Sequence, residues 1–187
     1  GIPFISVEEI INGSAIEKLK NIVYIESPAK KVASNAVVEL PLANVIQEEL
    51  IMINPDYEAK NEVLDGLIQL LIDGKYVKED FMLDVYKREA MGLTIIEKNI
   101  AIPHGRPINV LKEGIAIAIL KKPIDWSELN RVEFVFLLAL KEKSKEIVSR
   151  LYDLIKDKKF ISQLKLLATP SSIKNFFLEM LLKENLR

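Results

Sequence analysis

The chain has 187 residues, of which 49% are hydrophobic and 28% are charged, enough for one full core of a soluble globular protein. Its 26 basic and 27 acidic residues nearly cancel. No block rich in lysine or arginine indicates a nucleic-acid surface, so we expect no direct nucleic-acid contact from this segment. No apolar run is long enough for a membrane span and the start does not resemble a signal peptide, so the cytoplasm is the expected compartment.

Cysteine is absent and histidine occurs once. The sequence therefore excludes disulfides, thiolate catalysis and cysteine-type zinc sites, and it argues against a metal site built from histidines. We expect neither a metal nor a cofactor.

Residues 1–43 precede the regular part of the chain. Val7–Lys20 is typical of a short helix interrupted near Asn12-Gly13, and Asn21–Ile25 is typical of a strand. The chain begins at Gly1 and not at methionine, so we expect a fragment of a longer protein. We interpret residues 1–43 as a leader or as the tail of a preceding domain.

From residue 44 onward, apolar residues recur at helical spacing, with glycine or proline at the ends of the segments. The expected helices are Asn44–Leu50, Tyr57–Asp73, Lys78–Ala90, Lys143–Lys156, Phe160–Ala168 and Pro170–Glu184. Gly74 and Gly92 are the expected stops of the second and third helices.

The expected strands are a brief one at Ile51–Ile53 and three apolar runs at Ile100–Ile102, Gly114–Leu120 and Val132–Leu140. The last run is nearly continuous and not alternating, which is typical of a strand covered on both faces. The sequence therefore predicts an α/β domain over residues 44–187, with a small mixed sheet flanked by helices on both faces.

His104 is the first candidate for a functional residue. It follows an apolar strand, with Pro103 restricting the backbone before it and Gly105 allowing a sharp turn after it. Exposed positions held by a rigid sheet are where reactive groups usually lie, and imidazole is substantially neutral and nucleophilic near neutral pH. The alternative is a hydrogen-bonded histidine with only a structural role.

Two further residues are candidates for binding an anion near His104. Arg88 ends the helix that leads into this region, and its guanidinium could bind phosphate-like oxygens; alternatively, it caps its helix and pairs with Asp84. Thr94 could offer a hydroxyl to the anion, or it is a helix-terminating or strand-facing residue without such a role.

Three segments together resemble a family signature. They are Arg88-Glu89-Ala90, Thr94-Ile95 and Ile100-Ala101-Ile102-Pro103-His104-Gly105. They resemble the fructose/mannitol-type enzyme IIA domain of the phosphoenolpyruvate-dependent sugar phosphotransferase system, and the resemblance extends from about Ala43 to Arg187. It implies that His104 accepts a phosphoryl group from the phosphocarrier HPr and passes it to a cysteine of an enzyme IIB domain. It also implies that Arg88 stabilises the phosphorylated histidine.

The chain departs from this family at one position. Many members carry a second histidine at the start of the helix after the long strand, where this chain has Ile147. With this departure the chain resembles a second version of the family. In that version the domain ends a transcriptional regulator or antiterminator, and its phosphorylation is a signal. Residues 1–43 would then resemble the end of an enzyme IIB-like domain.

The sequence thus favours a phosphoryl-accepting enzyme IIA domain, a phosphotransferase component if it is active. The alternative is a non-catalytic module of the same fold that docks a partner without being phosphorylated. An unrelated hydrolase or transferase is disfavoured, because one histidine and no cysteine leave few ways to assemble a nucleophilic triad.

Overall fold

The computed structural model of the chain describes residues 40–97 and 99–185. They belong to one compact unit, which begins at Leu40. The elements expected within Val7–Lys20 and Asn21–Ile25, and the enzyme IIB-like interpretation of residues 1–39, lie outside the described residues.

The described residues form helices and strands that are interspersed along the chain. The helices are α3 (Pro41–Val45), η1 (Glu48–Leu50), α4 (Lys60–Asp73), α5 (Phe81–Met91), η2 (Pro107–Asn109), α6 (Lys145–Lys156), α7 (Lys158–Leu164) and α8 (Pro170–Asn185). The strands are β1 (Ile51–Ile53), β2 (Ile95–Glu97), β3 (Ile100–Ala101), β4 (Gly114–Ser127) and β5 (Asn130–Ala139).

Within the described residues the strands form one five-stranded sheet in the order β1-β4-β5-β3-β2. The pairs β1–β4 and β3–β5 are parallel, whereas β4–β5 and β2–β3 are antiparallel. The sheet is therefore mixed, as the sequence predicts.

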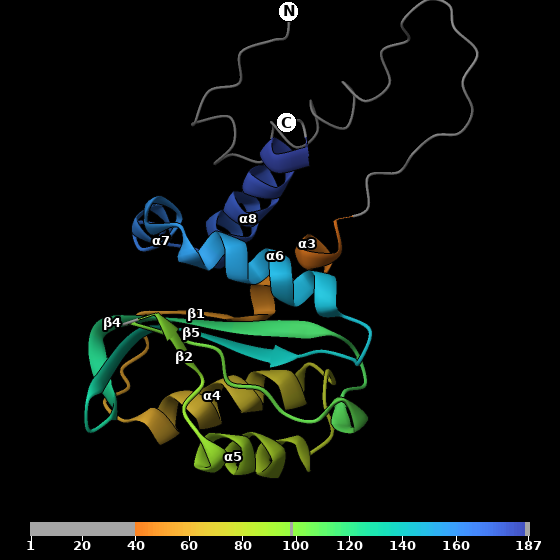
Figure 1. Cartoon of the computed structure of the whole chain (residues 1–187), viewed down its shortest axis with the longest axis vertical. Helices are drawn as coiled ribbons and strands as arrows, with labels where there is room; N and C mark the ends of the chain where they lie inside the picture. Colours follow the sequence, from red (N-terminus) through yellow and green to blue (C-terminus); the bar gives the residue numbers. More distant parts are fainter. Residues whose placement is uncertain (1–39, 98, 186–187) are drawn as a thin grey trace, which may run out of the picture. The chain divides into compact units, whose positions relative to one another are not determined.

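Helices cover both faces of the sheet, α4 and α5 on one and α3, α6, α7 and α8 on the other (Figure 1). Alternate residues of β4 serve the two faces: Ile115 and Ile117 join the core under α6 and α8, while Ala116 and Ala118 join the core under α4. This double coverage explains why the central strands read as continuous apolar runs, and it confirms the predicted fold class.

Most predicted helices are confirmed, with shifted starts. The helix expected from Tyr57 begins at Lys60, because the Glu62 carboxylate accepts hydrogen bonds from the backbone N–H groups of Glu58 (2.8 Å) and Ala59 (3.1 Å) and so caps the helix there. The prediction of one helix over Asn44–Leu50 is wrong. The structure has two shorter helices there, α3 and η1, and α3 begins at Pro41, because proline favours the first helical turn.

Two strand features differ from the prediction. The sequence does not predict the short β2, because its pairing with β3, and not its own residue pattern, decides it. The strand expected to end at Leu120 continues to Ser127 past Pro123, and a register shift between Ile119 and Ile124 accommodates the proline. Among the described helices, none has the length and apolar character required to cross a membrane.

Candidate functional site

His104 lies where the chain leaves the sheet after β3. It pairs with Leu138 in a parallel bridge that keeps the β3–β5 register, and the N–H of Leu138 donates to the carbonyl of Pro103 (2.9 Å). The backbone of His104 is therefore held by the central strand β5, while its side chain is only half-buried. This is the rigid, accessible position that the sequence predicts for a reactive group.

The two ring nitrogens of His104 have different partners. Nδ1 lies 3.2 Å from the carbonyl oxygen of Ile102, which can only accept, and Nε2 lies 3.2 Å from Nε of Arg88, which can only donate. The hydrogen bonds therefore fit a neutral imidazole with its proton on Nδ1 and a lone pair on Nε2. The nitrogen beside the arginine is therefore the one that carries the lone pair.

Arg88 lies in the last turn of α5 and makes two contacts. Besides its bond to His104, its Nη1 donates to the carbonyl of Gly92 (2.9 Å), the residue that ends the helix. The guanidinium thus binds the carbonyl at the end of its helix, as one alternative from the sequence has it, and it also faces His104. The other part of that alternative, a pairing of Arg88 with Asp84, is contradicted, because both carboxylate oxygens of Asp84 bind other residues.

Asp84 instead binds the segment that follows His104. Its buried carboxylate accepts hydrogen bonds from Nε of Arg106 and Nδ2 of Asn109, both at 2.6 Å. Burial would raise the pKa of Asp84, but the hydrogen bonds from Asn109 and Arg106 and the charge of Arg106 outweigh it, so its pKa lies below the usual value. The ionised carboxylate ties the chain after His104 to α5.

Gly105 allows this chain to pass close to α5. A Cβ atom at this position would lie 2.5 Å from Cε2 of Phe81, whose ring is fully buried in the core. A side chain there would push against the core or displace the histidine next to it. The glycine after His104 is thus required for close packing.

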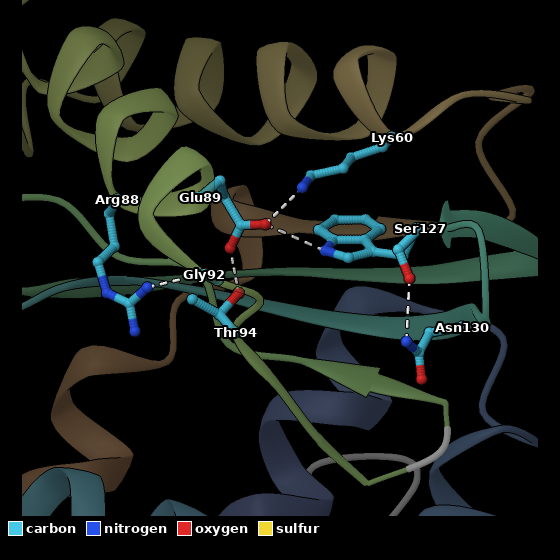
Figure 2. Close-up of polar contacts among 8 residues, drawn as sticks. Lys60, Arg88, Glu89, Gly92, Thr94, Ser127 and Asn130 are labelled. Carbon is cyan, nitrogen blue, oxygen red and sulfur yellow. Dashed lines mark hydrogen bonds and ion pairs between the residues drawn. The ribbon is translucent and has the colours of Figure 1, made fainter.

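Thr94 is buried, and its hydroxyl donates to a carboxylate oxygen of Glu89. The other oxygen of Glu89 accepts from Nζ of Lys60 (2.6 Å), as Figure 2 shows. The same oxygen accepts from Nε1 of Trp126 (3.2 Å). The structure therefore places Thr94 in a polar cluster with Lys60, Glu89 and Trp126.

Sequence reasoning missed Glu89, although a signal was present. Phe81, Val85 and Glu89 recur every four residues and form one stripe of α5. A carboxylate on an otherwise apolar stripe must be buried and paired, because an isolated buried charge is costly. The same argument applies to Asp84, three residues after Phe81.

Ile147 lies in the first turn of α6 and is buried in the core. It lines an open groove together with Pro107, Ile108 and Glu113. The position where many enzyme IIA domains have a second histidine is therefore apolar. Within the described ranges, no group of three histidine or acidic side chains is placed to hold a metal ion.

Comparisons with known proteins identify relatives of this chain. Residues 44–180 match the family described as phosphoenolpyruvate-dependent sugar phosphotransferase system, EIIA 2. A probable licABCH operon regulator of Bacillus subtilis (strain 168) is 29% identical over 82% of this chain and 22% of that protein. The mannitol-specific phosphotransferase enzyme IIA component of the same organism is 34% identical over 51% of this chain and 68% of that protein. This chain thus spans less than a quarter of the regulator.

Solved structures share the fold. Mannitol enzyme IIA of Escherichia coli, in a complex with phosphorylated mannitol enzyme IIB, has a TM-score of 0.64 at 19% identity and covers 71% of this chain and 96% of that one. The crystal structure of mannitol IIA from Escherichia coli has a TM-score of 0.61 at 20% identity over 69% of this chain and 96% of that one. At this identity the likeness establishes the architecture alone.

Proposed function

Because the chain belongs to the EIIA 2 family of the phosphoenolpyruvate-dependent sugar phosphotransferase system, we propose that His104 accepts a phosphoryl group from phospho-HPr. The group then passes to an enzyme IIB domain or acts as a signal that controls a transcriptional regulator. One observation carries the proposal: Nε2 of the only histidine in the chain faces a guanidinium, while Nδ1 is held by a backbone carbonyl.

The lone pair of His104 Nε2 attacks the phosphorus of the donor phosphohistidine. The new N–P bond forms as the donor N–P bond breaks, and the bonding electron pair returns to the donor imidazole. The Nδ1 proton of His104 stays on the ring, bonded to the carbonyl of Ile102. A ring that keeps this proton is a better leaving group, so the adduct stays labile enough for onward transfer.

Arg88 compensates the charge that arrives with the phosphoryl group. Its Nε already lies at hydrogen-bond distance from the nucleophile, so a small movement brings the guanidinium onto the phosphoryl oxygens. A unit charge at ~4 Å contributes about 4 kcal/mol at an effective dielectric of 20, and less where water enters a half-exposed site. The proposed role of Arg88 is therefore phosphate stabilisation.

Thr94 is proposed to act on the site indirectly. Its hydroxyl proton is bound to Glu89, and its carbonyl accepts from the N–H of Ile102 at 2.9 Å. It therefore supports the segment that carries His104 and does not donate to the phosphoryl group itself.

The proposed partners are HPr and an enzyme IIB domain, and the proposed compartment is the cytoplasm. The mannitol enzyme IIA structure in complex with phosphorylated enzyme IIB supports the second partner. Similarity to an operon regulator, together with an apolar residue at position 147, favours a signalling role over bulk transport.

Incubation with phosphoenolpyruvate, enzyme I and HPr tests the proposal. We expect an acid-labile phosphoryl adduct on the wild-type chain and none on the variant His104→Ala. Labelling of His104→Ala as strong as that of the wild type would reject His104 as the acceptor.

The second candidate is a non-catalytic module that docks an enzyme IIB or regulator domain without phosphorylation. The buried Ile147 motivates it, because no second imidazole is available there to orient the acceptor or share its proton. A folded wild-type chain that binds its partner but takes no label would favour this candidate.

A further inference from the structure

We infer that Glu89 is a positioning residue for phosphoryl transfer, which sets the geometry of His104 and Arg88 without touching either side chain's reacting atoms. The inference rests on the proposed function, because it assigns Glu89 a role in the same reaction. The Glu89 carboxylate is buried, and neither the attack of His104 on phosphorus nor the charge compensation by Arg88 uses it directly.

Glu89 is 7% exposed, and both of its carboxylate oxygens are bound. Thr94 donates to Oε1, while Lys60 and Trp126 donate to Oε2. Nζ of Lys60 also lies 5.3 Å from the centre of the Trp126 ring, so the ion pair is covered by the indole. These three donors, one of which is the Lys60 cation, hold the carboxylate in one orientation.

Glu89 also closes a ring of contacts that passes through His104. The Glu89 carboxylate holds the Thr94 hydroxyl, and the Thr94 carbonyl accepts from the N–H of Ile102 at 2.9 Å. The Ile102 carbonyl then binds Nδ1 of His104, and Nε2 of His104 binds Arg88, the chain neighbour of Glu89. Glu89 is therefore linked to His104 through hydrogen bonds on one side of the ring, and to Arg88 through the backbone on the other.

The ring joins two segments that the chain could otherwise place independently. Arg88 and Glu89 leave the end of α5 in different directions, one toward the carbonyl of Gly92 and the other toward Lys60 of α4 (Figure 2). Because neighbouring helical residues point about 100° apart, fixing the Glu89 carboxylate also fixes the rotation of the last turn, and with it the Arg88 side chain.

Loss of the Glu89 carboxylate would release the Thr94 hydroxyl. Because the Thr94 carbonyl holds the N–H of Ile102, the Ile102 carbonyl, which binds the Nδ1 proton of His104, would be freed as well. His104 would then populate the other tautomer, with its lone pair on Nδ1 and a proton where the phosphoryl group must attach. A displacement of about 1 Å at a reacting group costs on the order of 100-fold in rate. A partial release should therefore slow transfer about 10-fold or more.

The test compares Glu89→Gln and Thr94→Val with the wild type in the full chain. We expect both variants to lower the rate of labelling at saturating phospho-HPr about 10-fold, with little change in the HPr concentration for half-maximal rate. Thr94→Ser keeps the hydroxyl and should restore the rate. The ¹⁵N signals of the imidazole, unambiguous in a chain with one histidine, should move toward the other tautomer in Glu89→Gln and Thr94→Val.

Glu133→Gln is the matched control. Glu133 is also buried and paired with a lysine, Lys165, but that partner follows α7 on the other face of the sheet. It lies five positions before Leu138, about 16 Å along β5 from the bridge to His104. Its loss should lower thermal stability but leave the imidazole signals and the saturating rate unchanged.

The outcomes separate the inference from the proposed function. If His104 is labelled in the wild type, but Glu89→Gln and Thr94→Val match it in rate and imidazole signals, the positioning role is rejected and the acceptor role stands. If the wild type takes no label, the acceptor role fails, while the imidazole signals still decide whether Glu89 sets the tautomer. Should Glu89→Gln fail to fold, the comparison of Thr94→Val with Thr94→Ser gives the same decision.

Discussion

Nε of Arg88 donates to Nε2 of His104 across 3.2 Å, although the two residues are 16 positions apart in the chain. The contact joins the last turn of α5 to the segment that follows β3, which meet because α5 packs on the face of the sheet that contains β3. The arginine N–H thus points at the ring nitrogen whose lone pair the proposed phosphoryl transfer would use. For the proposed transfer to occur, this hydrogen bond must move from the ring nitrogen to the phosphoryl oxygens.

Arg88→Ala should slow phosphoryl acceptance by roughly 10-fold to 100-fold. Half-exposure of the arginine reduces its contribution to about 1.4–3 kcal/mol, and each 1.36 kcal/mol is a factor of ten in rate. Arg88→Lys should recover only part of the rate, because an ammonium group lacks the planar fork that binds two phosphoryl oxygens. Initial rates of labelling from phospho-HPr measure both effects. Equal rates for wild type and Arg88→Ala would remove the arginine from the mechanism.

Phosphorylation should occur on Nε2 of His104 and not on Nδ1. The carbonyl of Ile102 holds the proton on Nδ1, so only Nε2 presents a lone pair. The ³¹P–¹⁵N couplings of the labelled protein identify the nitrogen that carries phosphorus. A coupling to Nδ1 would contradict the orientation of the ring in the structure.

The sequence predicts the fold well because its main signals are local. The stripe of α4, with Val63, Leu67 and Leu71 spaced by four, requires only helical periodicity, and the apolar run of β5 requires only burial on both faces. Glycine and proline then place most of the ends. The short β2 and the extension of β4 past Pro123 were missed because pairing with a neighbouring strand decides them.

The candidate site was predictable only in part. His104 and Arg88 could be found from residue type and order, but their contact depends on how α5 packs beside β3. Tertiary packing also decides that Asp84 pairs with Arg106 and not with Arg88, since Arg106 lies 22 positions away in the chain. Local spacing favours the partner four residues distant, whereas the buried face of α5 turns Asp84 toward the loop after His104.

Gly105→Ala should destabilise the domain by about 1–3 kcal/mol, the usual cost of forcing extra volume into a packed core. The new Cβ would lie 2.5 Å from a carbon of the Phe81 ring, which is fully buried. Urea unfolding measures the loss. Phe81→Leu on its own lowers stability, but in the double variant it removes the clash with the new Cβ. The double variant should therefore be more stable than the sum of the two single losses in unfolding free energy predicts. Strict additivity would show that the residues do not oppose each other.

The coupling between Asp84 and Arg106 should weaken in acid. The pKa of Asp84 is lower in the folded protein than its usual value of 3.8, so the unfolded chain takes up the proton first as the pH falls. The stabilisation is therefore fully present above the usual pKa and is lost as the pH falls through the folded pKa. Because the Arg106 side chain is 69% exposed, solvent screens the pair, and a coupling of about 0.5–1.5 kcal/mol is expected near pH 7.

A double-mutant cycle with Asp84→Asn and Arg106→Gln isolates this coupling from the other carboxylates. Urea unfolding of the four proteins at pH 7, pH 4 and pH 3 should give a coupling energy that declines with each step, because protonated Asp84 no longer attracts the guanidinium. Asp84→Asn alone should also lose stability at pH 7, since its NH2 group would face one of the two donors, Arg106 or Asn109, whichever way the amide turns. A coupling energy that stays constant from pH 7 to pH 3 would mean that the hydrogen-bond geometry, and not the charge of Asp84, holds the loop after His104.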